Sequence, residues 1–141
     1  MVAGCLFCSV AEREVPAHLV YESPAVVAFL DHRPLFPGHT LVVPRAHVAT
    51  LRDLDPELRD ELFARVQLVA AAVQDAMGAA GCFVAMNNVV SQSVPHLHVH
   101  VVPRNPKDGL RGFFWPRSRY ADDEQAARVA AAVRLAIEAI V

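Results

Sequence analysis

Few cysteines and no long apolar segment are the first features that limit what this sequence can be. Its three cysteines among 141 residues are an odd number, which argues against a disulfide framework and favours free or metal-bound thiols. No apolar run approaches the roughly 20 residues that cross a bilayer. No basic residue precedes an apolar stretch at the N-terminus, so we expect no secretory signal, no membrane segment and a cytoplasmic location.

The chain also lacks a strong charge of either sign. Its 13 Lys and Arg residues against 15 Asp and Glu residues give a formal net charge of -2. Binding along a nucleic-acid backbone needs a basic face, so we expect no nucleic-acid partner. A small anionic ligand held by a few local donors remains compatible with this composition. The length suits a single domain over residues 1–141.

The pattern of apolar residues and turn formers predicts an α+β fold. Short runs of β-branched residues predict strands at 26–30 and 40–43, separated by a loop that contains prolines and a glycine. Residues 82–87 have the composition of another strand. Residues 107–120 mix aromatic and basic side chains without a period, and we assign no structure to them.

Capping residues and helical spacing predict two helices. Asp55 and Pro56 form a helix start, and the apolar residues after them repeat at helical spacing until Gly78, a plausible stop. Asp122 and Gln125 form a capping-box pattern ahead of a C-terminal helix with one apolar stripe.

A row of histidines is the most informative feature of the sequence. Residues 96–102 alternate between histidine and aliphatic side chains, which predicts a strand that ends at Pro103. Successive strand residues point to opposite faces, so His96, His98 and His100 should line one face together. A lone histidine on a strand is more often a solvated residue than a functional one, but three in register argue for a shared site.

Two chemistries suit such a row of imidazoles. The histidines could bind a catalytic metal that activates water, or one could act as a nucleophile near neutral pH. The residues just before the row favour the second chemistry, because the amide of Gln92, the hydroxyl of Ser93 and nearby backbone N–H groups can donate to phosphate oxygens. The sequence therefore favours a phosphate site.

The segment from Gln92 to Val102 resembles the signature of the histidine triad family, in which three histidines alternate with apolar residues. The resemblance extends to 31–34, 37–47 and 87–88 and covers residues 5–104, while 105–141 lack a strong match. It implies an α+β fold with a five-stranded antiparallel sheet, a long central helix and a C-terminal helix. It also implies a homodimer that binds a nucleotide or dinucleotide substrate.

The resemblance implies a role for each matching residue. His98 would attack the α-phosphate of a bound nucleotide to form a nucleotidyl-histidine, which water then hydrolyses. Neutral imidazole suits this role because it is both a good nucleophile and a good leaving group. The other catalytic residues implied are His100, Gln92 and Ser93, and the substrate-binding residues implied are Asp31 for the ribose, Asn87 near the phosphate and ribose, and Phe29 and Leu30 near the base.

The N-terminal cysteines form a candidate metal site. Cys5 and Cys8 have the C-x-x-C spacing that lets two thiolates reach one ion, although a redox pair or two packed small residues would show the same spacing. Many family members combine this pair with two histidines, which match His47 and His96 here. The resemblance therefore implies a structural Zn(II) with four protein ligands, and His96 would then serve the metal.

Several details of the resemblance bear on the reaction. The loop between Asn88 and Gln92 is shorter than in many family members, but the Pro-Gly-His segment ending at His39 looks nearer to the dinucleoside polyphosphate hydrolases. We therefore expect cleavage at the α-phosphate of dinucleoside polyphosphates or related conjugates. The alternatives are a nucleoside phosphoramidase, a dinucleoside polyphosphate phosphorylase, a metal-dependent hydrolase and a nucleotide-binding module without turnover. The segment Phe113–Trp115 could cover a second nucleotide, contact a second subunit or pack in the core.

Overall fold

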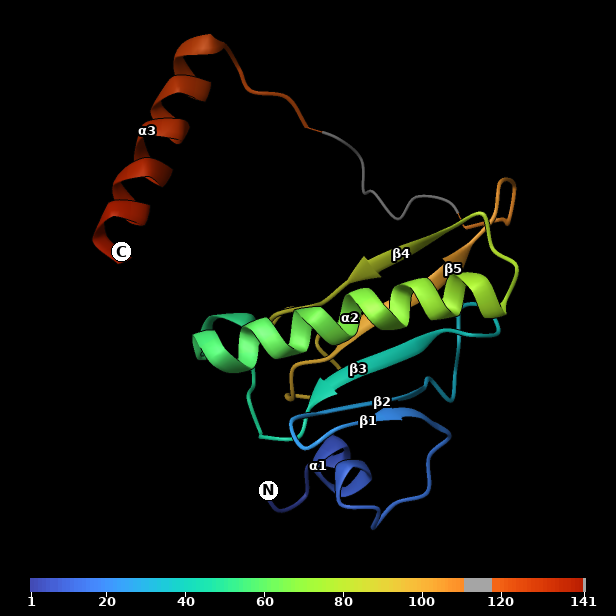
Figure 1. The fold of residues 1–141 in the computed structure, drawn as a ribbon. Helices are drawn as coiled ribbons and strands as arrows, with labels where there is room; N and C mark the ends of the chain where they lie inside the picture. The colour runs from blue at the N-terminus through green and yellow to red at the C-terminus, as the bar shows by residue number, and fades with distance from the viewer. Residues whose placement is uncertain (111–117, 141) are drawn as a thin grey trace. The chain divides into compact units, whose positions relative to one another are not determined.

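The computed structural model describes residues 1–110 and 118–140 and confirms the α+β prediction (Figure 1). Contacts within the chain define two compact units, Met1–Asp108 and Gly109–Val141, and each is described by itself. The segment Phe113–Trp115 lies outside the described residues. The single-domain organisation expected from the length of the chain stays a prediction.

A five-stranded antiparallel sheet with the strand order β1-β2-β3-β5-β4 forms the centre of the first unit. This sheet confirms the architecture that the resemblance implied. The first strand was not predicted, and β4 ends two residues earlier than expected. The strands are β1 (Leu19–Glu22), β2 (Val26–Leu30), β3 (Thr40–Pro44), β4 (Gly81–Ala85) and β5 (Val99–Arg104).

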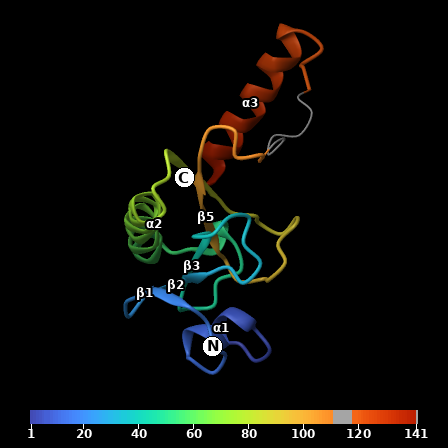
Figure 2. The same cartoon turned by 90° about the vertical axis from the view of Figure 1, so that its right-hand side faces the viewer.

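The long helix α2 (Pro56–Ala76) covers one face of this sheet (Figure 2). Its start agrees with the prediction, since Asp55 is the N-cap and its side chain accepts the Leu58 N–H at 2.8 Å. The helix stops just before Gly78, whose φ of +60° suits glycine. Buried residues of α2 such as Leu62 pack against the aliphatic side chains of the central strands.

The short helix α1 (Leu6–Ala11) packs on the opposite face of the sheet. Phe7, Cys8 and Val10 of this helix are buried against Phe29 and neighbouring side chains of β2 and β3. Sequence reasoning did not predict α1, because six residues are too few to show a helical period. This second core gives the sheet two covered faces, so side chains on both sides of the central strands are buried.

The histidine strand begins later than predicted. β5 starts at Val99 rather than at residue 96. The N–H of Leu97 donates to the carbonyl of Val48 at 2.7 Å, and Val48 lies beyond the end of β3. The residues that carry the first two histidines are therefore held by a loop rather than by the sheet ladder.

The same strand also ends later than predicted: Pro103 lies inside it, and Arg104 is its last residue. Pairing between β3 and β5 extends only from Val99 to Val101. Pro103 lies beyond this stretch and has a sheet neighbour on one side only, across from Cys82 of β4. A missing N–H is tolerated at such a position.

The second unit contains helix α3 (Asp123–Ile140), which confirms the predicted C-terminal helix. The Asp122 carboxylate accepts the Gln125 N–H at 2.7 Å, as the capping pattern indicated. None of the described residues of α3 is buried. Over residues 1–110 and 118–140, every helix is too short or too polar to pass through a bilayer.

Replacing Leu62 tests the packing of α2 against the sheet. The side chain is fully buried, so Leu62→Ala should lower the free energy of unfolding by about 2–5 kcal/mol through lost burial and the cavity left behind. Leu68→Ala is a matched control on the same helix, because Leu68 is 48% exposed, and its cost should stay below about 1 kcal/mol. Urea unfolding of both variants measures the difference, and equal costs would contradict the packing described.

Candidate active site and metal centre

The sheet separates the aliphatic side chains of the histidine segment from its imidazoles. Leu97 and Val99 belong to the core under α2, and the histidines that alternate with them point to the other face, where α1 lies. The ring centroids of His98 and His100 are 5.0 Å apart, and the Phe7 ring of α1 meets His98 edge-on at 5.0 Å. The histidine segment therefore presents its imidazoles to one face.

One ring nitrogen of His98 is occupied and the other carries a lone pair. Nδ1 lies 2.7 Å from the backbone carbonyl oxygen of His96. A carbonyl oxygen can only accept, so Nδ1 holds the proton of the neutral ring and Nε2 is unprotonated. The side chain is only 3% exposed. Among the described residues, His98 belongs to no group of donors that could surround an ion, so its lone pair is available as a nucleophile.

A chain of hydrogen bonds sets the opposite state in His100. The backbone N–H of Leu35 donates to Nδ1 of His39 at 3.0 Å, so the proton of neutral His39 lies on Nε2. That nitrogen is 2.9 Å from Nδ1 of His100 and donates to it. The proton of His100 must then lie on Nε2. The two neighbouring imidazoles therefore differ, because His98 offers a lone pair and His100 offers an N–H.

The pKa values of these rings agree with the hydrogen-bond chain. The pKa of His100 is lowered to about 4, chiefly by burial and also by the neighbouring His98 and His39, while Asp31 opposes the shift. Burial also lowers the pKa of His39, against the raising effect of the Asp31 carboxylate. Both rings are therefore neutral near pH 7 and can donate and accept as described.

Asp31 lies beside this chain and is not part of a metal site. One carboxylate oxygen is 3.6 Å from Nε2 of His39, and the other accepts the Arg33 N–H at 2.9 Å. Asp31, His39 and His100 are close enough to surround an ion. However, the Leu35 N–H occupies Nδ1 of His39, so the proton of this ring lies on Nε2. Nε2 is the nitrogen that would have to bind the ion, and with its proton it has no free lone pair. We therefore interpret the three as a hydrogen-bonded group.

The four predicted zinc ligands come together. The donor atoms of Cys5, Cys8, His47 and His96 lie within 4.8 Å of one another. Nδ1 of His96 is 3.4 Å from the Cys5 sulfur and 3.6 Å from the Cys8 sulfur, and Nδ1 of His47 is 3.4 Å from the Cys8 sulfur. Nε2 of His96 donates to the Pro44 carbonyl at 2.8 Å, so the nitrogen that faces the sulfurs has the lone pair that a metal requires.

This donor set fits Zn(II). Two sulfurs and two imidazole nitrogens form the usual tetrahedral set for that ion. The ligands come from the start of α1, the loop after β3 and the segment before β5, which are far apart in the sequence. Burial raises the pKa of the Cys8 thiol, and the nearby Cys5 adds to this. A bound cation would act against that shift by favouring the thiolates.

The residues expected to contact phosphate lie between β4 and β5. Ser93 and Asn87 are exposed. Gln92 is engaged at both ends of its amide: Oε1 accepts the Val89 N–H at 3.1 Å, and Nε2 donates to the Ala49 carbonyl at 2.7 Å. Gln92 therefore ties its loop to the segment before α2, and only its second amide hydrogen is left for a ligand.

The two residues expected near the base lie on opposite faces of β2. Phe29 is buried and meets Phe7 edge-on at 5.4 Å, and Phe7 also contacts His98. Leu30 lines an apolar hollow with residues of α2. The structure therefore brings Phe29 to the face that carries His98, and it places Leu30 on the other face because neighbouring strand residues alternate.

Sequence reasoning missed three contributors to this site. Phe7 lies between the two cysteines of the C-x-x-C segment. Because those cysteines were expected to share a metal with His96, the sequence could have indicated that Phe7 lies next to the histidine row. The Pro44 carbonyl and the Leu35 N–H are backbone groups, and no side-chain pattern reports where they point.

Comparisons with known proteins agree with this geometry. The chain matches the HIT domain over residues 12–107. It is 36% identical over 122 residues to "Protein hit" of Bacillus subtilis, and the alignment covers 85% of this chain and 83% of that protein. The crystal structure of a HIT family member from Bacillus subtilis has a TM-score of 0.83 at 31% identity, over 93% of this chain and 95% of the other.

A zinc-bound relative has also been solved. The crystal structure of a Zn-bound histidine triad family protein from Mycobacterium smegmatis has a TM-score of 0.72 at 33% identity, and the comparison covers 98% of each chain.

Two relatives have names that state an activity. An adenosine 5'-monophosphoramidase from Schizosaccharomyces pombe is 31% identical over 123 residues, which are 86% of this chain and 90% of that protein. An adenylylsulfatase from Arabidopsis thaliana is 32% identical over 108 residues, which are 75% of this chain and 55% of that protein. These names do not support the expected position in the dinucleoside polyphosphate branch. The family match and the shared fold nevertheless show that this chain belongs to the HIT family.

Proposed function

We propose that this chain is a nucleotide-binding hydrolase that releases a nucleoside monophosphate from a conjugate joined at the α-phosphate. The complementary states of His98 and His100 carry the proposal. Attack on phosphorus needs a lone pair, and the charged phosphate oxygens need a fixed donor. Two imidazoles whose centroids are 5.0 Å apart supply one of each.

The reaction proceeds in two displacements at phosphorus. In the first, Nε2 of His98 bonds to phosphorus while the bond to the leaving group breaks, and the leaving group takes the electron pair and then a proton. In the second, a water oxygen bonds to phosphorus, the imidazole of His98 departs and the water releases a proton. Throughout, Nδ1–H stays bonded to the His96 carbonyl, which stabilises the positive charge on the nucleotidylated ring. His100 donates to a phosphate oxygen through Nε2.

The remaining site residues are assigned by their positions. Phe29 contacts the base and Asp31 the ribose, since Phe29 shares a face with His98 and Asp31 adjoins His39. Ser93, Asn87 and the second amide hydrogen of Gln92 contact the phosphate or ribose. Leu30 is left out of this assignment because it faces α2.

The names of the two relatives favour one substrate class. The names adenosine 5'-monophosphoramidase and adenylylsulfatase both denote cleavage of an adenylyl conjugate. We therefore place adenylyl phosphoramidates first, and dinucleoside polyphosphates are the second candidate. The product formed in phosphate buffer separates the two reactions. Hydrolysis gives adenosine 5'-monophosphate, and phosphorolysis gives adenosine 5'-diphosphate.

Zn(II) bound by Cys5, Cys8, His47 and His96 would supply a structural cross-link, because four protein ligands leave no position for water. The proposed role of these residues is to hold the N-terminal turn against the segment that carries His98. The homodimer and the cytoplasmic location expected from the sequence remain predictions.

Replacing His98 tests the nucleophile. His98→Asn should lower kcat by about 10⁴-fold or more, because the amide cannot form the nitrogen–phosphorus intermediate. Release of adenosine 5'-monophosphate from adenosine 5'-phosphoramidate measures the rate, and His18→Asn, at an exposed histidine, should behave as the parent. Equal rates for His98→Asn and the parent would exclude the assignment, and tight binding by the parent without product would indicate a nucleotide-binding module.

Metal analysis tests the zinc site. The purified protein should contain about one zinc per chain, and the double variant Cys5→Ser/Cys8→Ser should lose the metal and melt at least about 5 °C lower. Cys82→Ser is the control, since Cys82 lies in β4 away from the cluster and should keep the metal. Full zinc content in the double variant would contradict the ligand assignment.

The pH dependence of stability tests the state of His100. Its pKa is about 4 when folded, against the ordinary 6.5, so between these values the unfolded chain binds more protons and the free energy of unfolding rises with pH. The contribution is fully present above about pH 6.5 and is lost as the pH falls towards 4. Urea unfolding at pH 4.5 and 7 should show a smaller difference for His100→Asn than for the parent. An unchanged difference would refute this origin.

A further inference from the structure

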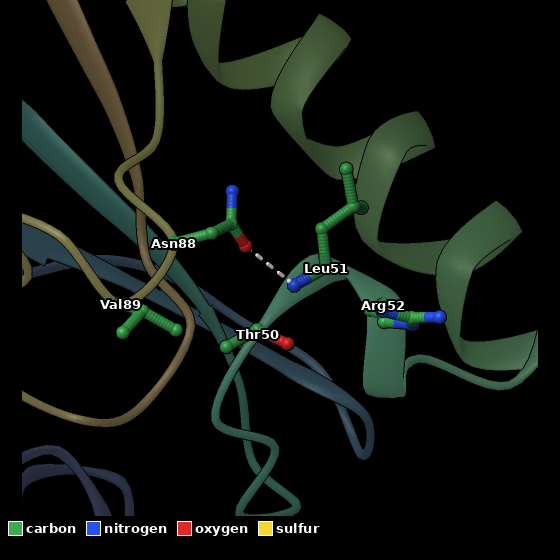
Figure 3. A pocket seen from close by; sticks show the side chains of 5 residues that line it. All are labelled: Thr50, Leu51, Arg52, Asn88 and Val89. Atoms are coloured by element: carbon green, nitrogen blue, oxygen red, sulfur yellow. Dashed lines mark hydrogen bonds between the residues drawn. The ribbon is translucent and has the colours of Figure 1, made fainter. Parts of the chain in front are cut away.

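A hollow of about 390 Å³ lies beside the loop that joins β4 to the histidine segment (Figure 3). One wall consists of Thr50, Leu51 and Arg52, and the other of Asn88 and Val89. The Asn88 side chain joins the two walls, because its oxygen accepts the Leu51 N–H at 2.7 Å. The volume falls in the range of small-molecule sites.

Hydrogen bonds place this hollow next to the proposed phosphate contacts. The Gln92 amide bonds the Val89 N–H in one wall and the carbonyl of Ala49, the residue just before the other wall. The carbonyl of Val48, close before Thr50, accepts the N–H of Leu97. In an in-line displacement the leaving group departs opposite the nucleophile. A leaving-group subsite should therefore adjoin a phosphate contact such as Gln92 rather than the nucleophile itself.

Val89 is an unfavourable residue at its position in two respects. Its φ is +68°, in the left-handed region that β-branched residues rarely adopt. The Val90 N–H donates to the Asn88 carbonyl at 2.8 Å, which closes a strained γ-turn around Val89. The side chain is also 74% exposed to solvent. Glycine would relieve the backbone and remove the exposed apolar surface.

Neither backbone preference nor burial accounts for a valine here, but contact with a ligand in the hollow does. Backbone strain of this kind clusters at ligand-binding positions. Leu51 on the opposite wall is 40% exposed and also lines the hollow, so a ligand in the hollow would bury apolar surface of both residues. In Figure 3 the side chain of Arg52, the one charged lining residue, extends away from Val89, and so does the side chain of Leu51. The apolar surface that Leu51 and Val89 contribute to the lining therefore suits an uncharged, apolar group.

We propose that this hollow is the leaving-group subsite and that it selects conjugates whose leaving group carries an alkyl or aryl chain. The inference rests on the proposed hydrolase function and names its substrate class: nucleoside phosphoramidates of bulky apolar amines. Val89 and Leu51 are the specificity-determining residues.

The test compares two substrates of the 141-residue chain. Adenosine 5'-phosphoramidate releases ammonia, and its N-(2-phenylethyl) derivative releases a bulky apolar amine. The measured quantity is the ratio of kcat/KM for the phenylethyl substrate to that for the unsubstituted one. Val89→Gly should lower this ratio about fivefold or more through lost apolar contact. Leu51→Ser should also lower it, because it removes apolar surface from the opposite wall. Val89→Ile should keep it.

Val90→Gly is the matched control, because Val90 is the next residue, is 78% exposed and does not line the hollow. Its ratio should equal that of the parent. Turnover of both substrates with an unchanged ratio in Val89→Gly and Leu51→Ser would overturn the subsite and leave the hydrolase function intact. An equal fall in Val90→Gly would overturn it too. Failure of the parent to cleave either substrate would instead refute the hydrolase function, and this inference with it.

Discussion

The hydrogen bond from Nδ1 of His98 to the carbonyl of His96 is the interaction on which the rest of the site depends. It holds the ring proton on one nitrogen and leaves the other able to attack. The same device recurs nearby, since the Pro44 carbonyl orients His96 and the Leu35 N–H orients His39. In each case the partner is a backbone group with a single role as donor or acceptor. The folded main chain therefore decides which nitrogen of each ring is available.

His96 joins the candidate zinc site to His98, the proposed nucleophile. Its ring faces the sulfurs of Cys5 and Cys8, while its carbonyl accepts the hydrogen bond from Nδ1–H of His98. Any movement of residue 96 therefore moves the group that sets the state of the nucleophile. A metal held by the cluster would restrain this residue without touching the phosphate. A closed ligand set with no catalytic position can in this way matter to a reaction in which it takes no chemical part.

Long periodic elements and side-chain motifs were predictable from the sequence, whereas short elements and backbone partners were not. The helix after Asp55 and the histidine row show clear periods, so their existence was predicted correctly. β1 and α1 are too short to show one. The start of β5 was misplaced because Leu97 bonds to the loop at Val48 instead of to β3, and periodicity does not report a pairing partner. The states of the rings depend on distant backbone groups, which only the fold brings together.

The short loop between β4 and the histidine segment explains why the Gln92 amide supports the loop as well as being a proposed phosphate contact. A longer, glycine-containing connection can turn with its own backbone, but here Val89 and Ser91 both adopt positive φ angles without glycine. Such a turn needs support from outside, and the side-chain amides of Asn88 and Gln92 provide it through bonds to the segment before α2. With most of the Gln92 amide used in this way, the proposed reaction depends mainly on the N–H of His100 as donor to the phosphate. The two amides hold the strained loop in place, so its exposed valine is fixed beside the proposed leaving-group subsite.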